Sequence, residues 1–158
     1  MDMVEVLKSN FIKLGLESTN KEDSIRELIE IGVEEGMVNS KEILFKDVME
    51  RESAFTTKIM EKIAIPHAKS NEVNEPFVVF GRSDKGITWN ENDEDKVFLE
   101  FLILVPNKNA SNEHMKILTT LARCLSHKDF RENLLRAENK QEVIEIVNNQ
   151  VKKICENN

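Results

Sequence analysis

One histidine of the chain directly follows an apolar segment that is expected to be extended. Residues 63–65 (Ile-Ala-Ile) lead to Pro66 and then to His67. Pro66 fixes its own φ angle and favours an extended conformation at the residue before it, which places His67 at the mouth of a buried element. A neutral imidazole is a good nucleophile towards phosphorus, and a pKa near ~6.5 keeps it mostly unprotonated. A histidine that only hydrogen-bonds the backbone at a strand end is the alternative reading of these residues.

A group of anion-binding residue types precedes this histidine. Arg51 and Glu52 stand at the end of an expected helix, and Thr56 and Thr57 follow shortly after. An arginine fork matches phosphate oxygens, and Glu52 could orient either the arginine or the imidazole. The two threonines add hydroxyl and backbone donors that could cradle an anion. A solvated helix end with an ordinary surface ion pair is the alternative.

A second histidine, His114, falls in the first turn of a helix expected after the strongest strand. Strand ends and helix N-termini gather ligands in α/β sheets, so His114 could hydrogen-bond a phosphoryl oxygen. A partly exposed helix histidine is the alternative. His127 has the character of a surface residue. Because the histidines show no metal-binding spacing, we expect no metal ion, and nothing in the sequence predicts a cofactor.

The elements that must position these residues follow from capping and apolar patterns. The expected helices begin near Asn20, Asn39, Ser111 or Asn112, Ser126 and Asn139, each with apolar residues at helical spacing behind it. Gly36 is expected to end the first of these helices. Strands are expected weakly at 11–16 and clearly at 77–80 and 97–105, whereas 52–70 is expected to be irregular. The polar segment around residues 84–86 is expected to be a loop.

This mixture predicts a single α/β domain over residues 1–158, with a mixed β-sheet and α-helices on both faces. The near-continuous apolar strand at 97–105 is expected to be central and covered on both sides. No apolar run reaches the ~20 residues that span a bilayer, and no secretory signal is visible at the start. Cys124 and Cys155 suggest no disulfide framework, so a cytoplasmic location is expected.

The net charge of −7 argues against a nucleic-acid-binding surface, which needs clustered Lys and Arg. Solubility is the plain reading of that charge. An acidic surface that steers the chain towards a basic protein partner is the weaker alternative.

Read together, the motifs resemble the fructose/mannitol-type enzyme IIA family of the bacterial sugar phosphotransferase system. The pattern in this chain is RE at 51–52, TT at 56–57, IAIPH at 63–67, GITW at 86–89, FLEFLILVP at 98–106 and SNEHMKIL at 111–118, followed by DFR at 129–131 and EV at 142–143. The set spans nearly the whole chain in order. An isolated IPH would mean little, whereas the ordered set is specific.

The resemblance implies that the chain is a phosphocarrier without a cofactor. The accepting histidine would be His67, phosphorylated on Nε2, and His114, Arg51 and Glu52 would complete the catalytic site. The small carrier protein HPr would be the phosphoryl donor. A IIB domain would be the acceptor, and a membrane IIC permease would follow. A regulatory, nitrogen-related IIA paralogue that serves no permease is the alternative, and the sequence names no sugar.

The chain departs from the family pattern between the threonines and the IPH segment. Lys58, Met60 and Lys62 stand where family members often carry glycines, so a stiffer loop is expected. We also expect HPr to dock on a surface whose centre is apolar, formed by residues 64–66 and Ala68, with Phe55 and Met60 contributing.

Overall fold

The computed structural model describes residues 7–58, 60–108 and 110–156, and within the last range the side chains of residues 110, 111, 113 and 114 are not described. Its centre is a five-stranded sheet. The strands are β1 (Ile12–Leu14), β2 (Ile63–Ala64), β3 (His67–Ser70), β4 (Phe77–Ile87) and β5 (Val97–Pro106). Strand β5 runs antiparallel to β4 and parallel to both β2 and β3, and β1 pairs parallel with the far side of β4. The predicted mixed sheet is confirmed.

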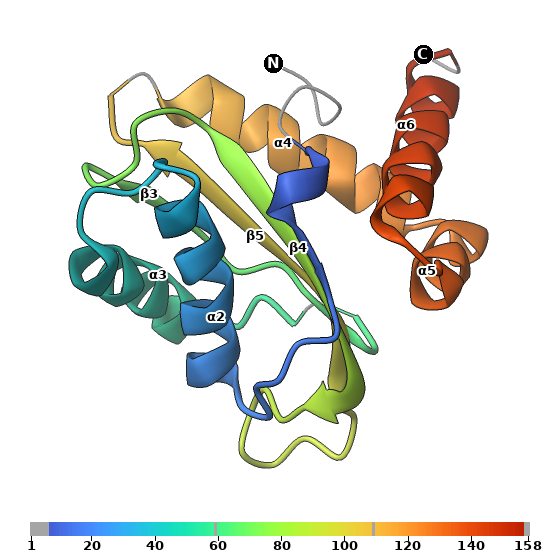
Figure 1. Ribbon diagram of the computed structural model, residues 1–158, viewed down its shortest axis with the longest axis horizontal. Coiled ribbons are helices and arrows are strands. Elements are labelled where there is room, and N and C mark those ends of the chain that lie inside the picture. The colour runs from blue at the N-terminus through green and yellow to red at the C-terminus, as the bar shows by residue number, and fades with distance from the viewer. Residues whose placement is uncertain (1–6, 59, 109, 157–158) are drawn as a thin grey trace.

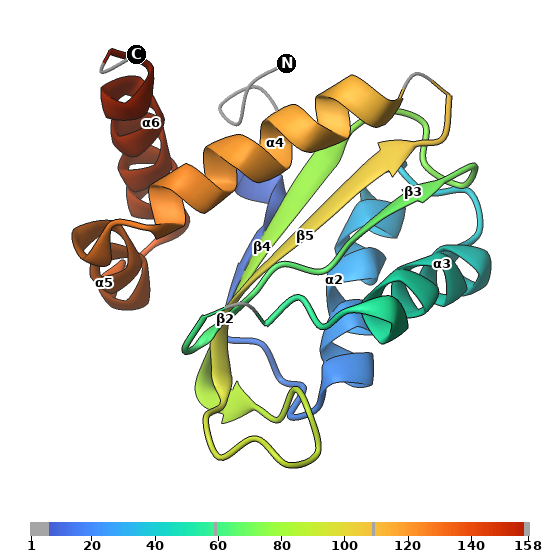
Figure 2. The same cartoon turned by 180° about the vertical axis from the view of Figure 1, so that it is seen from behind.

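Helices cover both faces of the sheet, as predicted (Figure 1). Helices α2 (Lys21–Glu34) and α3 (Lys41–Ala54) lie on one face. Helices α4 (Ala110–Leu125), α5 (Lys128–Arg136) and α6 (Lys140–Glu156) lie on the other, as the view from behind shows (Figure 2). A short 3-10 turn, η1 (Ser9–Phe11), precedes β1. The connection from β5 to α4 therefore carries the chain from the centre of the sheet to its α4 face.

The sheet separates two apolar cores, because alternate strand residues face opposite sides. Odd-numbered residues of β5 such as Leu99 and Ile103 pack with α4, α5 and α6. Even-numbered residues such as Leu102 and Leu104 pack with α2 and α3. All of these side chains are fully buried, which confirms the prediction of a central strand covered on both faces. Burial of each side chain of this size contributes roughly 1.5–3 kcal/mol, so this strand anchors the fold.

Two predicted helix starts are confirmed by their caps. The Asn20 side chain accepts a hydrogen bond from the Asp23 N–H at the start of α2. The Asn139 side chain accepts one from the Glu142 N–H, and the Glu142 carboxylate in turn accepts from the backbone N–H of Glu138. Gly36, with a φ of 72°, ends the chain's first long helix as predicted, because this left-handed conformation suits glycine.

Two other predicted caps are wrong by one residue. Helix α3 is capped by Ser40, whose hydroxyl accepts from the Ile43 N–H, rather than by Asn39. Asn39 instead donates its side-chain amide to Asn74. The N-cap of α5 is His127 rather than Ser126, because the Ser126 hydroxyl donates back to the Arg123 carbonyl. Helix α4 begins at Ala110, so Ser111 and Asn112 lie inside this helix and the predicted cap at one of them is also wrong.

Three predictions about the strands and their loops are also corrected. Residues 52–70 are not wholly irregular, because β2 and β3 both pair with β5 there. These strands are too short to show a period-2 pattern, and the pairing with β5 creates them. Strand β4 continues to Ile87 through the predicted loop at 84–86, with a register shift between Arg82 and Ile87. The opening strand is shorter than predicted, at Ile12–Leu14.

Among the described residues, no helix combines the length and the apolar character needed to cross a membrane.

Candidate phosphoryl-transfer site

The backbone around His67 is held between the central strand and the segment that follows α3. Strand β2 ends at Ala64 and β3 begins at His67, so the edge of the sheet is interrupted at Ile65 and Pro66. The Ile65 N–H donates to the Thr57 carbonyl at 3.2 Å, and the Ile103 N–H donates to the Pro66 carbonyl at 3.0 Å. Hydrogen bonds to the Thr56–Thr57 segment on one side and to β5 on the other therefore hold the two interrupting residues in place.

His67 lies on the sheet face that α4 covers. Its Cα pairs with that of Ile103 on β5, and side chains directly opposite across a ladder share one face. Ile103 belongs to the core under α4. The His67 side chain is 6% exposed, so the imidazole is nearly enclosed but retains an opening to solvent. The predicted position of this histidine at the start of a buried element is confirmed.

One ring nitrogen of His67 is occupied by a main-chain acceptor. The distance between Nδ1 and the Ile65 carbonyl oxygen is 2.9 Å. Because a carbonyl can only accept, Nδ1 carries the hydrogen in the neutral ring, and Nε2 then carries the lone pair. Burial lowers the pKa of His67, the Arg51 charge lowers it further, and the Ile65 hydrogen bond and Glu52 oppose this. The imidazole is therefore neutral at pH 7, as a nucleophile must be.

Glu52 acts on the backbone beside the site rather than on the imidazole directly. Its side chain is buried, and Oε1 accepts from the Trp89 indole N–H at 2.7 Å and the Thr57 N–H at 2.9 Å. The Thr56 hydroxyl donates to the same oxygen at 3.3 Å. Since the Thr57 carbonyl in turn holds Ile65, the Glu52 carboxylate supports the segment that orients His67.

Arg51 lies in the last turn of α3, next to the same segment. Its Nη1 donates to the Phe55 carbonyl at 3.2 Å, which helps to close the C-terminal end of the helix. The side chain is half-buried, and its positive charge is one of the influences on the pKa of His67. The structure thus brings Arg51 into the electrostatic neighbourhood of the imidazole, with part of its guanidinium directed to the backbone.

The two threonines differ in what they can offer an anion. Thr56 is exposed, and its hydroxyl also accepts from the Asn90 amide at 3.2 Å and the Lys58 N–H at 3.3 Å. Thr57 is buried, and within the described structure its hydroxyl has no hydrogen-bond partner. Thr56 is therefore already engaged in a local network, whereas Thr57 is held in place through its backbone.

His114 lies on α4, in the helix that begins where β5 ends. The helix follows the carboxyl end of the central strand as predicted, but His114 is its fifth residue and so lies just beyond the predicted first turn. Its side chain lies outside the described part of the structure, so the proposed contact between a second imidazole and a phosphoryl oxygen stays a prediction.

The sequence reasoning missed two groups that build the site. Trp89 supplies the shortest hydrogen bond to Glu52, and the Ile65 carbonyl determines which nitrogen of His67 is protonated. Trp89 could have been suspected, because it is the single tryptophan of the chain and stands in the GITW segment. A main-chain carbonyl leaves no mark in the residue types, so the role of Ile65 could not have been found.

The predicted apolar docking surface is wrong in part. Ala64, Ile65 and Ala68 are at most 5% exposed, and Pro66 is also buried, so these residues form core rather than surface. Phe55 is the exception, because it is 78% exposed. The exposed apolar side chain near the site is therefore Phe55, at the end of α3, and not the IPH segment.

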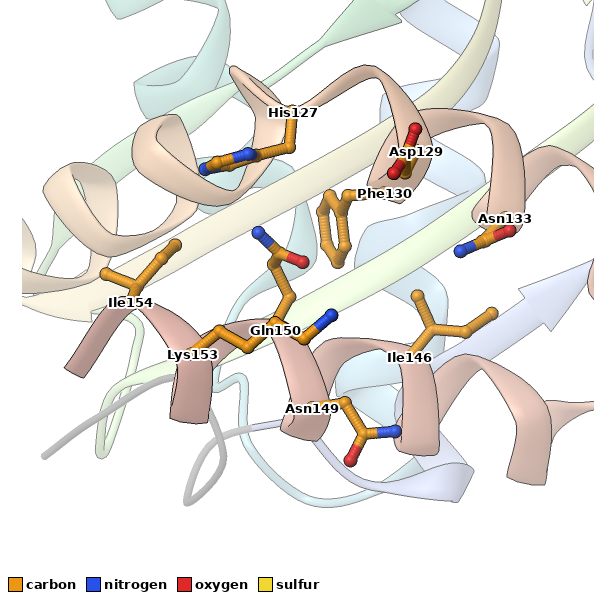
Figure 3. Close-up of a pocket in the computed structure, with 9 residues that line it drawn as sticks. All are labelled: His127, Asp129, Phe130, Asn133, Ile146, Asn149, Gln150, Lys153 and Ile154. Carbon is orange, nitrogen blue, oxygen red and sulfur yellow. The ribbon is translucent and has the colours of Figure 1, made fainter. Parts of the chain in front are cut away.

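A separate groove lies between α5 and α6, away from these residues (Figure 3). Phe130 forms part of its lining together with polar side chains such as His127, Asp129 and Lys153, all of them exposed. His127 therefore has the surface position expected of it. Across the described residues, no group of three or more His, Cys, Asp or Glu side chains is placed to hold a metal ion.

The mixed sheet and its flanking helices form an α/β fold in which His67 lies at an interrupted sheet edge. A family model for the EIIA 2 component of the phosphoenolpyruvate-dependent sugar phosphotransferase system matches residues 5–150, and the chain belongs to this family. EIIA components are phosphotransferase phosphocarriers, which agrees with the function that the motifs imply.

Two relatives differ in how much of their length this chain spans. The fructose-specific EIIA component of Haloferax volcanii is 36% identical over 92% of this chain and 94% of its own length. The fructose-specific EIIABC component of Bacillus subtilis is 35% identical over 94% of this chain, but the chain spans only 23% of that protein.

Solved structures confirm the fold. The nitrogen regulatory protein IIA-Ntr of Neisseria meningitidis matches with a TM-score of 0.83 and 29% identity, over 92% of this chain and 98% of that one. The mannitol enzyme IIA of Escherichia coli, in its complex with phosphorylated enzyme IIB, matches with a TM-score of 0.78 and 27% identity, over 94% and 99% of the chains.

Proposed function

We propose that this chain accepts a phosphoryl group on Nε2 of His67 from phospho-HPr and passes it to a IIB component for sugar uptake. The hydrogen bond between Nδ1 and the Ile65 carbonyl carries this assignment, because it leaves the lone pair on Nε2. The lowered pKa of His67 keeps that lone pair available at neutral pH.

In the transfer step the Nε2 lone pair forms a bond to phosphorus while the nitrogen–phosphorus bond of the donor imidazole breaks. The donor nitrogen keeps the electron pair of that bond. The work left to the protein is positioning and charge stabilisation. Arg51, with His114 as a second contributor, would stabilise the phosphoryl oxygens, and the Thr56–Thr57 turn would supply further donors. Glu52 would hold that turn in place.

The test is labelling with phosphoenolpyruvate, enzyme I and HPr. Wild-type protein is expected to take up one phosphoryl group, and His67→Ala none, with the fold retained by circular dichroism. His127→Ala is the matched control, because His127 is exposed at the start of α5 and is expected to label normally. Label on His67→Ala at wild-type stoichiometry would show that another residue is the acceptor. The ³¹P NMR shift of the labelled protein distinguishes Nε2 from Nδ1.

A regulatory role is the second candidate. The likeness to IIA-Ntr of Neisseria meningitidis supports it, because that protein is a nitrogen regulatory protein. Transfer from the phosphorylated chain to IIB components, assayed one at a time, separates the two. Rapid loss of the phosphoryl group to a IIB component supports transport, whereas stable retention in the presence of every IIB component of the source cell supports regulation.

A further inference from the structure

A second buried carboxyl group lies in the sheet, close enough for the charge of Glu52 to influence it. Glu100 stands in the central strand β5 and is fully buried. It pairs with Gly81 on β4 and with Ala64 on β2. As an even-numbered residue of β5, it faces the core formed with α2 and α3. Glu52 belongs to α3 and is therefore on the same side of the sheet. A carboxyl group in the middle of a sheet is unusual, because burial penalises its charged form.

The hydrogen bonds described for Glu100 do not suit an ionised carboxylate. Its Oε1 lies 3.4 Å from the Ser24 hydroxyl, and Oε2 has no partner among the described residues. The Ser24 hydroxyl is also 2.9 Å from the Lys21 carbonyl, which can only accept. Because a hydroxyl has only one hydrogen, the shorter contact with the Lys21 carbonyl competes with donation to Glu100. At 3.4 Å, the Ser24 hydroxyl compensates little of the charge that an ionised Glu100 would carry.

The charges that face Glu100 are also negative. Glu27 approaches from α2 and Glu52 from α3, and both raise the pKa of Glu100 in addition to burial. Its neighbours on β4 and β2 are uncharged. Lys13 is engaged with Glu27 at 2.7 Å, and Arg82 pairs with Leu99 and so lies on the opposite face. Within the described structure, no cation compensates a charge on Glu100.

Glu52 and Glu100 differ in the number of hydrogen-bond donors that contact each carboxyl group. Oε1 of Glu52 receives the Trp89, Thr57 and Thr56 donors, which stabilise a negative charge, although Oε2 of Glu52, like that of Glu100, has no partner among the described residues. Burial, with the neighbouring charges, raises the pKa of Glu100 to about 8, so it is mostly protonated at pH 7. Because two negative charges in a buried site repel each other, a proton on Glu100 removes a repulsion that would otherwise act on Glu52.

We propose that Glu100 is a positioning residue that stays a neutral carboxylic acid at neutral pH, so that Glu52 remains the single charge of the pair and keeps its hold on the Thr56–Thr57 turn beside His67. When Glu100 loses its proton to solvent, two negative charges face each other in a medium of low dielectric constant. The repulsion then weakens the hydrogen bonds from Trp89 and Thr57 to Glu52. The kinetic part of this proposal rests on the proposed function, whereas the conformational part does not.

Trp89 provides a direct reporter, because it is the only tryptophan and donates its indole N–H to Glu52. In a pH series from 6 to 10, the indole ¹H–¹⁵N resonance of the wild-type protein is expected to shift with a midpoint near the pKa of about 8. Glu100→Gln, a neutral isostere, is expected to abolish this inflection. Glu61→Gln is the matched control, because it makes the same chemical substitution at an exposed position. Absence of the inflection in the wild-type protein, or its survival in Glu100→Gln, overturns the proposal.

Phosphoryl transfer provides the second measurement. The rate of the Glu100→Gln variant is divided by that of the wild type at each pH, which cancels the titration of the donor. The ratio is expected to rise about tenfold between pH 7 and pH 9, since a group with a pKa of about 8 changes from mostly protonated to mostly ionised over that range. A constant ratio contradicts the coupling to His67. Failure of both proteins to accept phosphoryl at any pH contradicts the proposed function instead, while the Trp89 titration still decides the state of Glu100.

Discussion

The tautomer and the pKa of His67 are determined by a main-chain carbonyl and by burial as well as by the charged side chains nearby. The Ile65 carbonyl selects the ring tautomer, and burial lowers the pKa. Arg51 reinforces that shift, whereas Glu52 opposes it. The net effect lowers the pKa, so the ring is neutral at pH 7. Arg51 remains nearby as a positive charge for an incoming phosphoryl group.

The pKa of His67 is therefore expected to respond to Arg51 in a defined direction. An NMR titration of the imidazole should give a midpoint below the ordinary value of 6.5. In Arg51→Gln the midpoint should move up, because removal of a positive charge makes protonation easier. The Arg51→Gln variant should also accept phosphoryl about 10²-fold more slowly, the scale of losing one charge-stabilising donor. Arg136→Gln, an exposed substitution on α5, serves as the control and should change neither quantity. An unchanged midpoint in Arg51→Gln would place its charge away from the ring.

The pH dependence that His67 gives to stability has a definite sign. Its pKa is lower in the folded protein, so the folded state binds fewer protons than the unfolded chain below about pH 6.5. The contribution of His67 is thus present above that pH and is lost as the pH falls through the folded-state pKa.

Among the elements, the segment between α3 and β2 is the one that departs most from an unstrained backbone. Lys62 has a φ of 71°, the one positive value among the described residues that are not glycine. Its carbonyl accepts from the N–H groups of Phe98 and Leu99, so the pairing of this edge with β5 enforces the conformation. A left-handed conformation costs an L-residue roughly 1–2 kcal/mol.

Lys62→Gly is expected to stabilise the protein by a few tenths to about 1 kcal/mol. The relief of strain exceeds the larger entropy that glycine gives the unfolded chain. Urea unfolding followed by circular dichroism measures the change. Glu61→Gly, at the neighbouring position without a positive φ, should destabilise by about 0.5–1 kcal/mol and separates strain from loop flexibility. Destabilisation by both variants would mean that Lys62 carries no strain.

The end of α3 also presents the apolar side chain best placed for a partner. Phe55 is 78% exposed and directly follows the helix that carries Arg51. Burial of an aromatic side chain of this size contributes roughly 1.5–3 kcal/mol, so Phe55→Ser should raise the apparent KM for phospho-HPr about tenfold or more. Ile43→Ser is the matched control, because Ile43 is also exposed, at 52%, but lies at the opposite end of α3. Equal effects of the two substitutions would assign the loss to general surface polarity rather than to docking.

The sequence indicated several elements that depend on a single local rule. The Asn20 cap, the Gly36 stop and the apolar strand at 97–105 each depend on nearby residues, and each is confirmed. Strands β2 and β3 were missed because their pairing with β5 is a tertiary effect. The same reason explains the buried alanines of the IPH segment. Small apolar residues fit a docking surface and a core equally well, and only the register with β5 decides between them.

For the molecule as a whole, Glu100 is expected to cause a loss of stability as the pH rises from about 4.5 to about 8. Its pKa is raised in the folded state, to about 8 from 4.5, so the folded protein binds more protons than the unfolded chain between these values. The free energy of unfolding is therefore highest below this window with respect to Glu100, and it declines as the pH rises through the window.

The free energy of unfolding of Glu100→Gln, minus that of the wild type, should grow by at most about 1.4 kcal/mol per pH unit between about pH 4.5 and 8 and level off above it. Denaturant unfolding at several pH values gives this difference, and it removes the contributions of all other groups. Glu61→Gln, an exposed substitution, should show no such slope. A difference independent of pH would mean that Glu100 is ionised to the same extent in both states.

The interruption of the sheet edge at Ile65 has a consequence for how the site can vary. The choice of nucleophilic nitrogen depends on a main-chain carbonyl, and no side-chain substitution deletes a carbonyl. Mutation can therefore alter the partner surface at Phe55 or the charge at Arg51 while the reactive atom stays the same. Such a site can diverge between transport and regulation, since the part that must not change is encoded in the path of the backbone.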